Sequence, residues 1–146
     1  MTKTAFYILS FTWGAPTTLA GCVLALWHIA HGRKPKKWGC CYYFEYGDRL
    51  WGGMSLGIFF FKDKSDSVHI KNHEHGHAVQ NCFFGPFMPF IVAIPSFTRY
   101  WYREYLMRVR HTAPKTKYDA VWFEGQATRL GTHFVSHLGS DSARPQ

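Results

Sequence analysis

The first apolar stretch runs from Ala5 to Ala30 and contains no Asp, Glu, Lys or Arg over 26 residues. As one helix it would be about 39 Å long, against about 30 Å for the hydrocarbon core of a bilayer. The stretch is longer than the apolar part of a cleaved signal peptide, and a soluble helix of this length would show a polar face. We therefore predict one N-terminal transmembrane helix as an anchor over residues 1–32, which Gly14 and Pro16 can kink.

Basic residues follow the predicted anchor directly, at Arg33, Lys34, Lys36 and Lys37. By the positive-inside rule they place the chain from residue 31 onward in the cytoplasm and the N-terminus outside the cell membrane. Anionic lipid headgroups explain such a run beside an apolar span better than nucleic acid does. We therefore expect the lipid bilayer as a partner, and no nucleic acid.

After the basic residues the apolar segments of the chain become shorter. Residues 40–62 hold two runs rich in aromatic and apolar residues, separated by the turn-forming sequence GDRLWGG, which predicts a β-hairpin. The polar sequence KDKSDS ends it. Residues 68–84 are typical of a helix, which Gly85 and Pro86 terminate.

Residues 82–97 carry no charge but contain three prolines, Pro86, Pro89 and Pro95. A 16-residue helix would reach only about 24 Å, so we predict a proline-broken re-entrant segment. The sequence TRYWYREYLMRVR after it is typical of a helix at the lipid headgroups. A C-terminal helix is expected from about Tyr118, followed by a flexible tail over residues 139–146.

The composition narrows the class of protein. The chain has 146 residues and a formal charge of +8, with 47% hydrophobic and 18% charged residues. Such a chain is too apolar to be disordered. Its four cysteines form no CxxC motif, so we expect free thiols rather than a disulfide framework. The predicted fold class is an α+β membrane protein, in which residues 33–138 form a minimal metal-binding domain.

The candidate chemistry lies in the expected helix over residues 68–84, where His73, Glu74 and His77 form an HExxH motif. Residues four apart lie on one face of a helix, so the two imidazoles can bind one ion while Glu74 faces a water on that ion. Zn²⁺ accepts such ligands and activates water. Glu74 is therefore the candidate catalytic base, and His73 and His77 are the candidate metal ligands.

A third ligand must come from elsewhere in the chain. The longer motif that adds a downstream histidine needs Gly at position 80 and His at position 83, where this chain has Gln80 and Phe83. Glu124 is the preferred third ligand, because a lone carboxylate among apolar and small residues needs a cation. The other candidates are Asp119, His69, His111, His133 and His137.

An HExxH motif followed by a helical ExxA, here Glu124 to Ala127, resembles the glutamate-ligand zincins, especially the membrane-bound zinc peptidases of the HtpX and CAAX-prenyl-protease type. The resemblance implies that His73, His77 and Glu124 bind zinc and that Glu74 is the general base. Those enzymes have Asp directly after that Ala, where this chain has Thr128. The chain is similar, more closely, to small uncharacterised bacterial membrane proteins that carry HEHGH.

These observations predict an integral-membrane zinc metallopeptidase that hydrolyses peptide bonds near the cytoplasmic membrane face. His73 and Glu124 can share an ion only if residues 82–97 do not cross the bilayer, which is why the re-entrant form is expected. Residues 53–61 could supply a strand edge for an extended peptide substrate. Candidates to stabilise the oxyanion are Arg99, Arg103, Tyr100 and His111.

Two alternatives stay open. The first is a non-catalytic membrane protein with a structural zinc site, in which His69 or a cysteine supplies a fourth ligand. The second is a membrane anchor or partner-binding protein, in which the HExxH motif is a coincidence.

Overall fold

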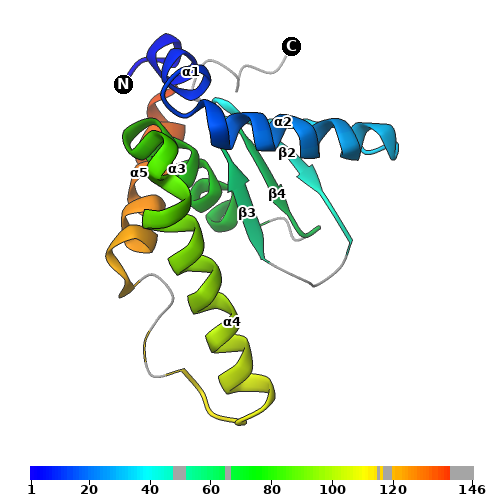
Figure 1. Cartoon of the computed structure of the whole chain (residues 1–146), viewed down its shortest axis with the longest axis vertical. Helices are drawn as coiled ribbons and strands as arrows, with labels where there is room; N and C mark the ends of the chain where they lie inside the picture. The colour runs from blue at the N-terminus through cyan, green and yellow to red at the C-terminus, as the bar shows by residue number, and fades with distance from the viewer. Residues whose placement is uncertain (48–51, 65–66, 115, 117–119, 139–146) are drawn as a thin grey trace.

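The computed structural model describes residues 1–47, 52–64, 67–114, 116 and 120–138. In this part the chain forms five α-helices and a four-stranded β-sheet (Figure 1). The helices are α1 (Lys3–Phe11), α2 (Ala15–Ala30), α3 (Val68–Phe84), α4 (Ile94–Arg108) and α5 (Trp122–Leu138), and the strands are β1 (Lys36–Trp38), β2 (Cys41–Glu45), β3 (Gly53–Leu56) and β4 (Phe59–Lys62). The predicted tail over residues 139–146 lies outside the described residues, and the predicted domain boundaries stay predictions.

The prediction of one N-terminal transmembrane helix is wrong, because the chain bends by 89° between α1 and α2. Pro16 lies in the first turn of α2, where its missing N–H is tolerated and its ring keeps the preceding residues from continuing a helix. In the described part, each helix taken singly falls short of the length and apolar character needed to cross a bilayer. The pairs α1–α2 and α3–α4 reach the required length and apolar character only when the two helices of each pair are counted together. The chain bends by 89° within the first pair and by 116° within the second.

The sheet also differs from the predicted single hairpin. Its strand order is β1-β2-β4-β3, with antiparallel pairs β1–β2 and β3–β4 joined by a parallel pair β2–β4. Successive side chains of a strand point to opposite faces of the sheet, so the parallel pairing of β2 with β4 places one aromatic pair on each face. Tyr43 stacks on Phe60 at 5.1 Å on the face toward α3, and Phe44 stacks on Phe61 at 5.6 Å on the face toward α2. Strand β3 is thereby left at the edge of the sheet.

The predicted re-entrant segment is not a separate element, because residues 82–97 are helical almost throughout. Helix α3 ends at Gly85, whose φ of +52° favours glycine. A 3₁₀ turn (Gly85–Phe87) and a π-helical turn (Pro89–Ala93) then lead into α4. The prolines occupy the first positions of these turns, where a missing N–H costs little.

Helices α3 and α5 approach each other through glycines. A Cβ at Gly76 would lie 1.8 Å from the carbonyl oxygen of Ala127, and a Cβ at Gly131 would lie 1.6 Å from the carbonyl oxygen of Asn72. Any larger residue at these two positions would therefore push the helices apart. The expectation of free thiols is confirmed, and Cys40 and Cys41 lie in the core together with Cys82 of α3.

We predict that Gly131→Ala lowers the free energy of unfolding by about 1–3 kcal/mol, because the new methyl group overlaps the backbone of α3. Denaturant unfolding followed by circular dichroism measures the change. Gly47→Ala is the control, since a Cβ there meets nothing within 4 Å. Equal stability of the two variants would contradict the close approach of the helices.

Candidate metal centre

Helix α3 carries the HExxH motif as predicted, and its bounds match the expected helix over residues 68–84. Ser67 caps its N-terminus, with its hydroxyl accepting a hydrogen bond from the backbone N–H of Ile70. His73 and His77 are both buried and lie one turn apart on the face toward α5. Their Nε2 atoms are 3.1 Å apart.

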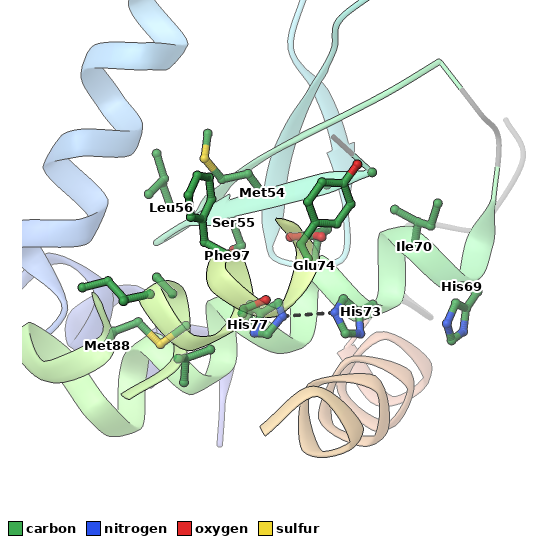
Figure 2. Close-up of a pocket in the computed structure, with 17 residues that line it drawn as sticks. Met54, Ser55, Leu56, His69, Ile70, His73, Glu74, His77, Met88 and Phe97 are labelled. Atoms are coloured by element: carbon green, nitrogen blue, oxygen red, sulfur yellow. Dashed lines mark hydrogen bonds between the residues drawn. The ribbon is translucent and has the colours of Figure 1, made fainter. Parts of the chain in front are cut away.

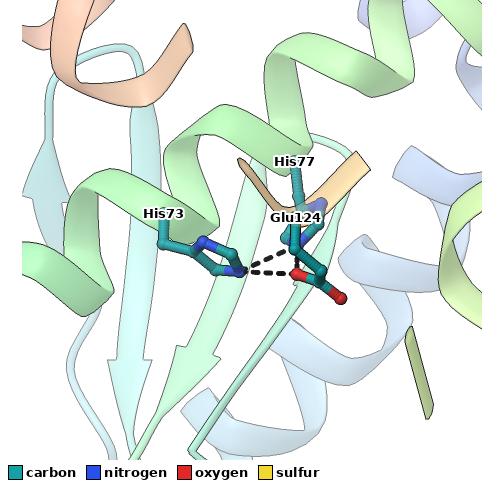
Figure 3. A group of neighbouring side chains, drawn as sticks. All are labelled: His73, His77 and Glu124. Carbon is teal, nitrogen blue, oxygen red and sulfur yellow. Dashed lines mark hydrogen bonds and ion pairs between the residues drawn. The ribbon is translucent and has the colours of Figure 1, made fainter. Parts of the chain in front are cut away.

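Glu124, in the first turn of α5, completes the cluster (Figure 3). Its side chain is fully buried, and its Oε2 lies 3.0 Å from Nε2 of His73 and 3.3 Å from Nε2 of His77. Ligands bound tetrahedrally at 2.0–2.1 Å are about 3.3–3.4 Å apart, so these three atoms lie close to the spacing that one ion requires. The three residues therefore form a buried group that can bind a metal ion.

The other candidate ligands do not join this group. Asp119 lies outside the described residues. The ring centroid of His69 is 6.3 Å from that of His73, and His69 lines the neighbouring cavity instead. His111, His133 and His137 are exposed, the last two with their rings 4.4 Å apart on the far part of α5.

Gln80 determines which nitrogen of His77 carries a proton. The Gln80 amide nitrogen donates to the carbonyl oxygen of Phe123 at 2.8 Å and to Oε1 of Gln126 at 2.9 Å. The amide oxygen is therefore the atom that faces Nδ1 of His77 at 2.8 Å, so that Nδ1 must donate. This leaves Nε2 of His77 with a lone pair directed at the cluster, as a metal ligand needs.

Two further side chains contact the other two candidate ligands, His73 and Glu124. Oγ1 of Thr128 lies 2.9 Å from Nδ1 of His73, and the hydroxyl of Ser96 donates to Oε1 of Glu124. The sequence interpretation missed all three supporting roles, including that of Gln80. The sequence held a signal for two of these roles. Gln80 is three residues after His77 and Thr128 is four residues after Glu124, and these spacings place each pair on one helix face. Ser96 had none, because it reaches the site from α4.

The electrostatics of the cluster fit a bound cation. Burial would raise the pKa of Glu124, but the contacts with His73, His77 and Ser96 hold it well below its usual value. Burial would lower the pKa of His77, and the carboxylates of Glu124 and Glu74 raise it instead. Oε2 of Glu124 is buried and makes no aligned hydrogen bond within the described part of the chain. A single proton can form a hydrogen bond between only two of the three atoms, Nε2 of His73, Nε2 of His77 and Oε2 of Glu124. A divalent ion can bind all three.

Glu74 borders the cluster without belonging to it. It lines a cavity of about 700 Å³ together with His73 and His77 (Figure 2). Burial raises the pKa of its carboxyl, and its Oε2 has no hydrogen-bond partner among the residues that the structure describes. A Cβ at Gly53 of strand β3 would lie 2.2 Å from Oε1 of Glu74, so a larger residue there would displace this carboxylate. The rest of the cavity wall is mainly apolar, with Met54, Leu56, Ile70, Met88, Val92, Ile94 and Phe97.

Comparison with family models, with curated proteins and with solved structures gives no match to this chain. The assignment of a metal-binding group therefore rests on the geometry of His73, His77 and Glu124. The class of site that this geometry defines is a buried His-His-Glu group that can bind a metal ion, beside a mainly apolar cavity.

We predict that Gln80→Leu lowers the affinity for the metal roughly 10- to 100-fold, because His77 loses the partner that orients its ring. Competition with a chromogenic chelator measures the affinity. Gln126→Ala is the control, because it leaves Gln80 its contacts with His77 and the carbonyl oxygen of Phe123, and it should keep most of the affinity. Equal affinities for Gln80→Leu and the wild type would contradict this role of Gln80.

Proposed function

We propose that this protein is a zinc-dependent peptidase in which His73, His77 and Glu124 hold the ion and Glu74 is the general base. The observation that carries the proposal is the convergence of those three ligands beside a buried carboxylate, at the wall of a cavity that a strand edge borders. Zinc suits this donor set of two nitrogens and one oxygen, and when bound it polarises a carbonyl and makes water acidic enough to react near neutral pH.

Residues of the chain would supply the proton transfer, the orientation of the ligands and the stabilisation of the oxyanion. Glu74, the residue after the first ligand, accepts the proton of the attacking water and passes it to the leaving amine. Gln80 and Thr128 keep both imidazoles in the orientation that the ion needs. Tyr100 is our candidate to donate a hydrogen bond to the developing oxyanion, because it lines the same cavity.

The other oxyanion candidates lie elsewhere. Arg99 and Arg103 reach Thr116, at its hydroxyl and its carbonyl oxygen respectively. His111 is exposed beyond the end of α4. Among the four, only Tyr100 contributes to the described wall of the cavity.

Strand β3 supports a peptide as the substrate. It pairs with β4 on one side, and its residues Gly53–Leu56 line the metal cavity. An extended peptide can add to such an edge through main-chain hydrogen bonds. The apolar wall of the cavity would then receive a large apolar side chain of the substrate.

The alternative of a structural zinc site requires a fourth protein ligand. Within the described residues the cluster has three, and neither His69 nor a cysteine belongs to it. Cys40, Cys41 and Cys82 lie instead in the hydrophobic core. Three protein ligands leave a coordination position for water or substrate, which favours the catalytic interpretation. The predicted localisation, with the N-terminus outside and the metal site on the cytoplasmic side, stays a prediction.

The proposal predicts that Glu74→Gln retains zinc but loses peptide hydrolysis by at least about 100-fold, since a general base contributes that much or more. Digestion of a mixed peptide library, followed by mass spectrometry, compares the variant with the wild type, and elemental analysis gives the zinc content. Glu104→Gln is the matched control on α4, where Glu104 pairs with Arg108. Unchanged cleavage by Glu74→Gln would remove Glu74 from the mechanism.

A further inference from the structure

Helix α2 is apolar on most of its circumference, but the described residues of the chain cover only one side of it. Its residues Thr18, Gly21 and Ala25, three or four apart, are buried. On another face, Val23 and Leu26 are 70% and 65% exposed. A helix that is apolar all round is normally buried in protein or lipid, so the outer side of α2 lacks the surroundings that its composition calls for.

Helix α4 and the turn before it carry a second exposed apolar stripe. Phe90, Ile94, Phe97 and Trp101 are spaced four, three and four residues apart, which places them on one helix face. All four are exposed, Phe90 by 69%, and α4 buries none of its residues. Figure 1 shows α4 extending away from the rest of the chain.

The two stripes lie on elements that neighbour each other, with Leu56 of β3 between them. Trp13, in the bend between α1 and α2, donates a hydrogen bond to the carbonyl oxygen of Phe83 at 3.2 Å, and its ring packs against Phe87 before α4. Leu56 of β3 lies in a groove with Val23 of α2 and also lines the metal cavity opposite α4. We name this surface the apolar belt, formed by Val23, Leu26, Phe90, Ile94, Phe97 and Trp101.

Exposed basic residues stand at both ends of the apolar belt. Lys34 and Lys37 follow α2, Arg110 follows α4, and the whole chain has a formal charge of +8. An apolar face flanked by basic residues matches a bilayer surface with anionic headgroups. A second copy of this chain fits less well, because a symmetric contact through the belt would bring groups of like charge together.

We propose that the apolar belt binds the surface of an anionic phospholipid bilayer, so that the metal cavity opens beside the lipid. Ile94 and Phe97 belong to both the belt and the cavity wall. This inference goes beyond the proposed peptidase activity, because it holds whether or not the metal centre cleaves peptides.

Flotation of the full-length protein with vesicles tests the inference. The Glu74→Gln background keeps the measurement independent of hydrolysis. The protein should float with vesicles of phosphatidylcholine and phosphatidylglycerol and much less with pure phosphatidylcholine. Adding Leu26→Glu and Phe90→Glu should reduce the bound fraction at least tenfold, because two charges would enter the apolar region. Lys34→Gln with Lys37→Gln should weaken binding to the anionic vesicles on the order of tenfold.

Val68→Glu is the matched control, because Val68 is 55% exposed at the start of α3, outside the belt. It should float like its parent, and circular dichroism shows that each variant is folded. Absence of flotation with anionic vesicles, or equal flotation of the Leu26→Glu, Phe90→Glu variant, overturns the inference. A soluble dimer that these two substitutions dissociate, with no vesicle binding, would identify a second copy as the occupant and also overturn it.

Discussion

The close contact between α3 and α5 determines the geometry of the candidate centre. The backbones meet where Gly76 and Gly131 have no side chains, and this spacing lets the short side chain of Glu124 reach both imidazoles of the motif. With the helices further apart, Oε2 of Glu124 would leave the range in which one ion bridges the three ligands. The stability of this helix pair and the capacity for a metal are therefore two consequences of one packing contact.

The polar groups around the cluster are linked through hydrogen bonds from three helices. Gln80 is held by the backbone of α5 and in turn orients His77 on α3, so the two helices are linked by hydrogen bonds as well as by packing. Ser96 adds α4 to the network through Glu124. In the account proposed here, α4 has two roles, since one part contacts the metal centre while its exposed stripe faces lipid.

The sequence was informative where one element carries the pattern. The HExxH helix was predicted with its observed bounds, because the polar sequence before it and the Gly85–Pro86 pair after it mark its ends. Glu124 was predicted as the third ligand, because an isolated carboxylate in an apolar helix is costly unless a cation compensates it, and the structure places it beside both imidazoles. These inferences needed only local spacing and the energetics of burying a charge.

Features that depend on contacts between distant segments could not be predicted in this way. The parallel pairing of β2 with β4 depends on stacking between aromatic side chains on separate hairpins. The break near Pro16 was recognised only as a kink, whereas Trp13 anchors a bend of 89° by contacts with the turn after α3. Thr128 was noted only as a departure from the zincin pattern, yet it lies beside His73, where it can orient the imidazole.

X-ray absorption spectroscopy at the zinc edge of the protein purified with zinc tests the central claim most directly. Ligation by His73, His77 and Glu124 predicts nitrogen and oxygen scatterers at about 2.0–2.1 Å, two of them imidazoles, and no sulfur at about 2.3 Å. Glu124→Ala should change the first coordination shell or abolish stoichiometric zinc. A sulfur scatterer, or a spectrum and zinc content unaffected by Glu124→Ala, would contradict the proposed centre.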